Sequence, residues 1–162
     1  LTDEKAALKV QFYSYMADCY YSLDSVRFAF DMFDTVLKIN PNDILVLNNY
    51  AYYLSLERRD LDKAEEMSYK TVKSEPKNPT YLDTYAWILF EKGNYAEARL
   101  YIDDAIKNDK DQSDTILEHG GDIYYMTGDV DGALKYWQQA LDMGSKSKTL
   151  KEKIKKKKYI AE

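Results

Sequence analysis

The chain has 162 residues, of which 45% are hydrophobic, and this content is enough for a continuous core, so disorder is excluded as the default state. Six glycines and three prolines are too few for a fold of many short strands, and the single cysteine excludes an internal disulfide framework. The net charge of −5 divides into −11 over residues 1–145 and +6 over residues 146–162, so an acidic body precedes a basic tail. The acidic body argues against general nucleic-acid binding.

The first residues, Leu1 to Glu4, include neither an initiator methionine nor a basic-then-apolar signal segment. We therefore expect a mature product or a piece excised from a longer protein, and favour the excised piece. The stretch from Ile44 to Leu56 has 13 uncharged residues, too few and too polar to span a bilayer, so no transmembrane helix is expected. Composition leaves the compartment open, since a cytoplasmic protein and a part of a longer exported, periplasmic protein both fit.

Small residues recur along the chain in two registers with a period of 34 or 35 residues. The first register is Ala17, Ala51, Ala86 and Gly121, and the second is Ala29, Ala64, Ala98 and Ala133. A large side chain follows each member of the first register three positions later. A large side chain also follows each member of the second register four positions later, except at Ser68. Antiparallel helices approach closely where small residues face large ones, so the period predicts four stacked helix hairpins with a shared core.

The predicted helices follow this period from one end of the chain to the other. In chain order they span residues 4–22, 26–38, 43–56, 61–74, 79–91, 95–107, 114–126, 130–143 and 147–160. Asn78 before Pro79 is a helix start signal, and Gly93 and Gly128 supply the left-handed turn residue between paired helices. The helices group into a domain over residues 1–145 and a basic helix over 147–162, with 1–9 as an N-terminal helical extension and repeats at about 10–43, 44–78, 79–113 and 114–146.

The two C-terminal repeats carry a full motif of small, aromatic and turn residues. It comprises Gly121, Tyr124, Gly128, Asp129, Ala133, Trp137 and Ala140 in one repeat and Ala86, Leu89, Gly93, Ala98 and Ala105 in the other. The first two repeats keep the small residues but have Asp24-Ser25 for the turn glycine and a longer turn at Arg58-Arg59. This pattern resembles the tetratricopeptide repeat (TPR) family, and among its members bacterial TPR-repeat proteins. The resemblance implies an all-α, right-handed α-solenoid of about four hairpins, closed by a C-terminal capping helix.

The resemblance further implies a concave groove that is lined by the first helix of each hairpin and receives a peptide or a helix of a partner. Helical spacing then selects the partner-binding residues: Asp18, Tyr21, Asn48, Asn49, Tyr52, Asp83, Trp87, Phe90, Glu118, His119, Asp122 and Tyr125, with Gln11, Ser14, Ser55 and Thr84 on the same flank. One aromatic from each hairpin would form a stripe between carboxylates, which suits a basic or apolar peptide. The alternative is that these rings merely fill gaps between neighbouring first helices.

Family members that grip chaperone tails use cations on successive first helices, whereas this groove has acids, so chaperone-tail binding is disfavoured. An enzyme is not expected, because His119 is the only histidine and Cys19, the only cysteine, lies about three repeats away. No phosphate-binding glycine loop, dinucleotide motif or Cys-x-x-Cys pair is present, so we expect no cofactor, no metal and no catalytic residue.

The tail over residues 147–160 places Leu150, Ile154 and Tyr159 or Ile160 along one side of a lysine-rich helix. Its leading interpretation is a cap that covers the last hairpin. A rival interpretation is contact with an anionic partner, although the absence of arginine disfavours specific nucleic-acid recognition. A third is attraction to the acidic body, in the same molecule or in a neighbour.

Two functions follow from this pattern. The first is a non-enzymatic scaffold that binds a peptide or helix of a partner in its groove. The second is a structural spacer or self-association array within a larger TPR protein, whose grooves are filled by its own termini or by a second copy, with no separate ligand. An exposed apolar end at residues 1–9 would then also allow a homo-oligomer.

Overall fold

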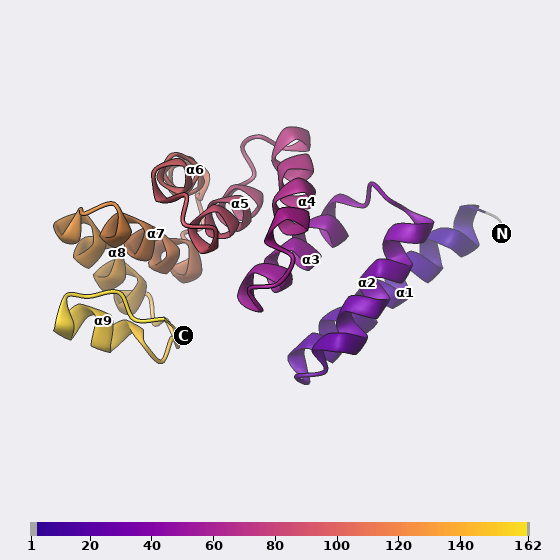
Figure 1. Cartoon of the computed structure of the whole chain (residues 1–162), viewed down its shortest axis with the longest axis horizontal. Coiled ribbons are helices and arrows are strands. Elements are labelled where there is room, and N and C mark those ends of the chain that lie inside the picture. The colour runs from indigo at the N-terminus through magenta and orange to yellow at the C-terminus, as the bar shows by residue number, and fades with distance from the viewer. Residues whose placement is uncertain (1–2, 162) are drawn as a thin grey trace.

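The computed structural model describes residues 3–161, which form nine α-helices and no strand (Figure 1). Their bounds are α1 Asp3–Ser22, α2 Val26–Ile39, α3 Ile44–Leu56, α4 Leu61–Ser74, α5 Pro79–Glu91, α6 Tyr95–Asn108, α7 Asp114–Met126, α8 Val130–Asp142 and α9 Leu150–Lys156. From α1 to α8, every helix begins and ends within one residue of the range predicted from the sequence. The prediction of an all-α hairpin solenoid is confirmed.

The helices pack as four hairpins, α1 with α2, α3 with α4, α5 with α6 and α7 with α8, and each hairpin also contacts the next. In Figure 1 the chain advances from α1 at one end to α8 and α9 at the other. The small residues of both registers are buried where the helices touch. At Gly121 an added Cβ would lie 2.3 Å from Trp137 Cδ1, so the missing side chain is what admits the indole ring between α7 and α8.

Helix starts are fixed by side-chain oxygens that accept backbone N–H groups. Asp43 caps α3, Asn78 caps α5 and Ser113 caps α7. Asp129 does the same for α8 by accepting from the Gly132 N–H, whereas Asn94, which precedes α6, makes no side-chain cap. The sequence signals for helix starts are therefore used at the first helix of three successive hairpins.

The turn inside each hairpin has a left-handed residue at the same place in the repeat. Gly93 and Gly128 have φ angles of 81° and 86°, a region that glycine enters without steric penalty. In the first two hairpins Asp24 and Arg58 take this conformation, with φ angles of 59° and 50°. The departure from the glycine pattern therefore leaves the turn geometry intact and puts a steric penalty on the non-glycine residues.

Helix α5 is the most enclosed element of the described chain. Every residue from 81 to 90 is buried, because α3, α4, α6 and α7 all contact this helix. The buried apolar side chains of α5 join those of α6 and α7 in one cluster that includes Leu89, Ile102 and Ile123. The middle of the array is consequently a rigid platform for the polar groups on its first helices.

The tail differs from its prediction. The helix expected over residues 147–160 occupies only Leu150–Lys156, and Lys157 ends it with a left-handed φ angle of 50°. Leu150 is fully buried against the cluster of α8 that contains Trp137, so α9 does cover the last hairpin. Beyond α9 the chain turns back toward the middle of the array, as the yellow end of the trace in Figure 1 shows.

Candidate functional site: a groove over the first helices

A cavity of about 530 Å³ lies between the first helices α3, α5 and α7 and the C-terminal segment. We call it the groove. Its walls include the aromatic rings of Tyr52, Trp87 and Tyr159. The charged groups around it are mostly carboxylates, namely Glu57, Glu91, Asp114, Glu118 and Asp122, with Arg58, Lys146 and Lys153 as the cations. The groove therefore combines flat apolar surface with a negative rim.

The structure brings five of the twelve sequence-predicted site residues to this cavity. They are Tyr52, Trp87, Glu118, His119 and Asp122. Asp83 and Phe90 lie directly behind them and are buried. The remaining predicted residues, Asp18, Tyr21, Asn48, Asn49 and Tyr125, lie on the first helices but do not line the cavity.

The aromatic stripe expected from the sequence does not run from end to end. Tyr21 stacks on Tyr53 with ring centroids 3.8 Å apart, and its hydroxyl donates to Glu57. Tyr125 lies against Trp137, with ring centroids 6.0 Å apart. Only Tyr52 and Trp87 of the four predicted rings share the cavity. Tyr21 and Tyr125 lie four positions after the small residue of their repeat, whereas Tyr52 and Trp87 lie one position after it. The first pair is therefore about one helical turn further along, which explains the separation.

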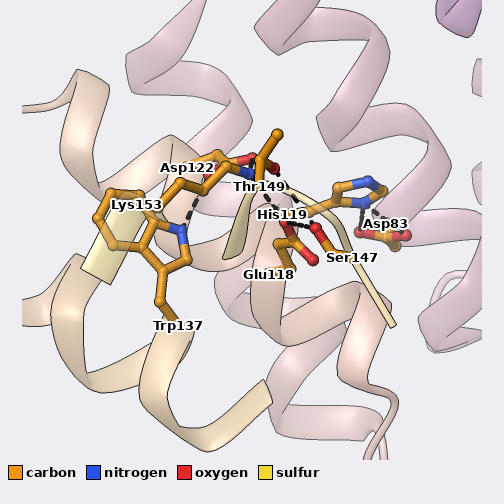
Figure 2. Close-up of polar contacts among 8 residues, drawn as sticks. All are labelled: Asp83, Glu118, His119, Asp122, Trp137, Ser147, Thr149 and Lys153. Atoms are coloured by element: carbon orange, nitrogen blue, oxygen red, sulfur yellow. Dashed lines mark hydrogen bonds and ion pairs between the residues drawn. The ribbon is translucent and has the colours of Figure 1, made fainter. Parts of the chain in front are cut away.

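His119 is stacked between the platform and the groove. Its ring lies 4.1 Å from the Trp87 ring, centroid to centroid, and the two planes are 16° apart. Its Nδ1 donates to the Asp83 carboxylate at 2.9 and 3.1 Å, as Figure 2 shows. This hydrogen bond crosses from α7 to α5 and fixes the imidazole in one orientation.

The second polar cluster forms around a lysine that comes from the tail. Lys153 Nζ lies 2.8 Å from Glu118 Oε1 and 2.8 Å from Asp122 Oδ2, and only 2% of the residue is exposed. The other Asp122 oxygen accepts from Trp137 Nε1 at 2.9 Å, and Ser147 Oγ donates to Glu118 at 2.8 Å (Figure 2). Each carboxylate is therefore held by a second donor while it binds the ammonium group.

The tail continues across the groove after α9. The Tyr159 ring packs edge-on against Phe90 of α5 with centroids 5.4 Å apart, and Lys153 Nζ lies 5.6 Å above the same tyrosine ring. The third interpretation of the tail, attraction to the acidic body of the same molecule, thus describes the contacts that Lys153 makes. It coexists with the capping contact of Leu150 rather than replacing it.

Burial and neighbouring charges shift the pKa values of two groups in this cluster. Burial raises the pKa of the Asp122 carboxyl to about 6, although the Lys153 ammonium and its hydrogen bond act in the opposite direction. Burial lowers the pKa of the His119 imidazole, but the charge of Asp83 and its hydrogen bond, helped by Asp122 and Glu118, more than compensate. The pKa of His119 is therefore raised, and the protonated ring is favoured beside these acids.

Three buried polar atoms of the described residues lack a hydrogen-bond partner: Asn48 Oδ1, Ser68 Oγ and Trp87 Nε1. The Trp87 residue lines the groove and is 8% exposed. A buried N–H group without an acceptor is unfavourable by about 1–3 kcal/mol. The Trp87 N–H is enclosed by protein, although other atoms of the residue line the groove.

Lys153, Tyr159 and Ser147 are among the groove residues that the sequence interpretation missed, as are Glu57, Arg58, Glu91, Asp114 and Lys146. A signal for Lys153 was present, because it lies three residues after Leu150 and thus on the apolar side of α9. A lysine in that position requires buried carboxylates as neighbours. Those neighbours come from α7, about 30 residues earlier in the chain, and local spacing carries no information about them.

Within residues 3–161 no group of three histidine, cysteine or acidic side chains is placed to hold a metal ion. In the same range no helix is both long and apolar enough to cross a membrane. Cys19, the one thiol, is exposed on α1, away from His119 on α7. The lining of the groove consists mainly of charged and aromatic side chains.

Comparison with known proteins places these features in a family. Models described as tetratricopeptide repeat match residues 32–66, 53–114 and 86–148. A TPR repeat-containing protein of Pseudomonas aeruginosa is 29% identical over 72 residues, which cover 44% of this chain and 12% of that protein. The chain thus corresponds to a small part of this relative's length.

Solved structures with the same fold are similar at low sequence identity. PilF of Pseudomonas aeruginosa superimposes with a TM-score of 0.79 at 17% identity, covering 94% of this chain and 69% of PilF. PilW, a widely conserved type IV pilus biogenesis factor, gives 0.72 at 20% identity over 83% of this chain and 61% of its own. MamA from Desulfovibrio magneticus RS-1 gives 0.70 at 16% identity over 85% of this chain and 78% of its own.

These structural matches bear on the fold alone. The sequence-family matches overlap one another and together extend over the second to fourth hairpins, with part of the first. Proteins with such repeats are generally non-catalytic scaffolds for protein interactions. On its repeat pattern, its hairpin stack and these matches, the chain belongs to the tetratricopeptide repeat family.

Proposed function

We propose that the chain is a non-enzymatic scaffold whose groove binds a polypeptide segment of a partner protein. The observation that carries the proposal is the cavity of about 530 Å³ at which Tyr52 and Trp87 meet Glu57 and the carboxylates of α5 and α7. The volume is in the range of sites that take a few side chains of a ligand. The aromatic rings provide contact area with little loss of side-chain entropy, and the acids attract a cationic segment.

The wall of the groove is also preorganised. Trp87 stacks on both Phe90 and His119, with ring centroids 4.5 and 4.1 Å apart. Asp83 lies behind His119 and holds its ring rigid by a hydrogen bond, and both residues are buried. A preorganised surface loses less entropy on binding and therefore binds more tightly.

The proposal is tested by quantitative capture from the source cell's lysate with three full-length chains: wild type, Tyr52→Ala and Tyr69→Ala. Tyr69 is a matched control because it is an exposed tyrosine on α4, a second helix that does not line the groove. We expect Tyr52→Ala to capture less of the specific partner than the wild type by about tenfold or more, as is common for an aromatic anchor. Tyr69→Ala should capture as much as the wild type. Equal capture by all three chains would refute a groove-dependent scaffold, provided that circular dichroism shows equal helicity.

A second candidate function is self-association, and a separate observation favours it. Helix α1 exposes Leu8, Phe12 and Tyr15 to 67%, 60% and 63%, at a spacing that places them along one side of the helix. Phe12→Ser should leave the helicity unchanged and convert a dimer into a monomer in sedimentation equilibrium. A wild-type chain that is monomeric at 100 micromolar or more, about the range of weak interfaces, would rule this candidate out.

A further inference from the structure

We propose that the segment recognised by the groove is an amphipathic helix that carries a lysine, and that residues 150–160 of the chain are its internal stand-in. This inference rests on the function proposed above and specifies the partner's chemistry. A partner helix would place its own lysine between Glu118 and Asp122, where Lys153 lies. The C-terminal segment and the partner would then compete for one site.

The lysine site is built as a receptor for an ammonium group. Both carboxylates lie 2.8 Å from Lys153 Nζ, and both are oriented by further donors, Trp137 Nε1 for Asp122 and Ser147 Oγ for Glu118. A site that is filled by a neutral side chain would leave two buried carboxylates unpaired, which is strongly unfavourable. The groove therefore selects a cation at this point.

A buried ion pair of this kind adds little net stability compared with apolar packing of the same volume. Its effect is to discriminate between ligands, because only a lysine-like group satisfies both acids. For a helix whose sole task is to cap α8, an apolar side chain at position 153 together with apolar residues in place of Glu118 and Asp122 would serve as well. The choice of lysine is thus explained by recognition rather than by capping.

The internal stand-in is held by few contacts. Helix α9 has seven residues, of which Leu150 and Lys153 are the buried ones. Five lysines at its exposed side and end, Lys151, Lys155, Lys156, Lys157 and Lys158, repel one another. A helix this short is marginal without tertiary packing, so α9 belongs to the part of the chain that opens at low free energy.

The stand-in also leaves part of the groove empty. The cavity continues past Lys153 and Tyr159 as far as Tyr52 and Leu56 on α3. A longer partner helix or its flanking residues would fill this space. These contacts are available to the partner and not to the internal segment, so they offset the loss of the α9 contacts.

The charge of the rim identifies the class of partner. Glu57, Glu91 and Asp114 line the cavity beside the cations Arg58 and Lys146, and Arg58 is paired with Glu91 at 2.8 Å. Together with Glu118 and Asp122, acids outnumber cations along the cavity even when Lys153 is included. A segment with basic residues beside its central lysine is attracted by these acids, whereas a nucleic acid or an acidic peptide is repelled. The partner is therefore a protein that presents a basic helix.

The test uses full-length chains and a fluorescent peptide with the sequence of residues 146–161, followed by anisotropy. In the Lys153→Met chain the internal lysine no longer competes, so we expect the peptide to bind about tenfold more tightly than it binds the wild type. The same peptide with methionine at the position of Lys153 should bind each chain at least tenfold more weakly. Lys156→Met is the matched control, because Lys156 is exposed, and it should behave as the wild type.

Equal binding of both peptides to all three chains would overturn the inference. Should Lys153→Met lose helicity, hydrogen exchange on the wild-type chain decides instead. Excess lysine peptide should speed exchange of the amides of residues 153–156 several-fold, while the methionine peptide leaves them unchanged. Unchanged exchange with both peptides means that α9 is a permanent cap and also overturns the inference.

The outcomes separate this inference from the proposed function. Loss of the partner in Tyr52→Ala together with no effect of either peptide keeps the groove-binding scaffold and rejects the lysine helix. A strong peptide effect with equal capture by all chains keeps the lysine site and rejects the scaffold.

Discussion

At the scale of single residues, the groove contains an unusual density of buried charge: Asp83, Glu118, His119, Asp122 and Lys153 are all less than 10% exposed. Burial of unpaired charges is expensive, so each of them must be bonded. The structure meets this requirement with two linked sets, His119 on Asp83 and Lys153 on the other two acids. The protonation of one set therefore affects the other, since Asp122 and Glu118 also raise the pKa of His119.

The raised pKa of His119 leads to a first prediction. The chain has one histidine, so its Cε1–H resonance can be followed without ambiguity by NMR from pH 5 to 9. We expect a midpoint above the ordinary histidine value in the wild type and a clearly lower midpoint in Asp83→Asn, because the charge of Asp83 opposes the effect of burial. Asp104→Asn, an exposed change on α6, serves as the control, and a midpoint that Asp83→Asn does not lower would contradict the assignment.

Gly121 provides a second prediction. Its added Cβ would lie 2.3 Å from Trp137 Cδ1, and the ring is fully buried and cannot move aside. Gly121→Ala should therefore lower the free energy of unfolding by about 1–3 kcal/mol, the usual effect of overpacking. Urea unfolding measures it, with Gln138→Ala on the exposed side of α8 as a control that stays within about 0.5 kcal/mol of the wild type. An unchanged urea midpoint for Gly121→Ala would contradict this prediction and mean that α7 and α8 can move apart enough to admit the methyl group.

At the scale of the helix hairpin, the turns differ in how they reach the same conformation. Asp24 has a φ angle of 59° where Gly93 has 81°. Asp24→Gly should stabilise the chain by up to about 1 kcal/mol by removing the left-handed penalty, while Gly93→Ala should destabilise it by about 1 kcal/mol. Thermal unfolding of the two variants and the wild type measures the sign of each change in stability. Shifts of the same sign would show that the turn conformation is not the controlling factor.

The elements up to α8 were predictable because the period of small residues held at every hairpin, and turn glycines agreed with it in the last two. The end of α9 was not, since a run of lysines has good helix propensity and only the left-handed Lys157 and the contact of Tyr159 with Phe90 stop it. For the groove, helical spacing selected Tyr52, Trp87 and the α7 acids. It could not predict Lys153 among them, because that placement depends on how the tail folds over the array.

At the scale of the whole molecule, stability is expected to be graded along the array. Repeat proteins gain stability from neighbouring units, and α5 has neighbours on all sides whereas α1 and α9 are terminal. Hydrogen exchange should therefore be slowest in residues 82–90 and fastest in the first turns of α1 and in α9. A uniform rate across all helices would indicate a single cooperative unit without graded ends.

The dependence of stability on pH provides a further prediction for the whole chain. Because burial raises the Asp122 pKa to about 6, the folded chain holds this proton more tightly than the unfolded chain, whose aspartates titrate near about 4. This contribution is therefore fully present below pH 4 and is lost as the pH rises through 6.

Urea unfolding at pH 4.5 and 7.5 measures the difference between wild type and Asp122→Asn, with Asp104→Asn as the control. The loss of stability toward pH 7.5 should be smaller in Asp122→Asn, because asparagine does not titrate while Lys153, Glu118 and His119 still face the site. An equal or larger loss in that variant would contradict the raised pKa.

The contact of Tyr159 with Phe90 also determines how the chain responds to mechanical load. Tension transmitted through residue 161 reaches α5 and α7 together, through the tyrosine ring and the Lys153 ion pairs, before it acts on α8. The Tyr159 ring contact and the Lys153 ion pairs therefore share the load and must break together. Hairpins that are pulled from an open end instead lose their contacts one turn at a time. The last hairpin is thus shielded from a pulling machine, such as an unfolding protease, until the segment over the groove has been pulled away.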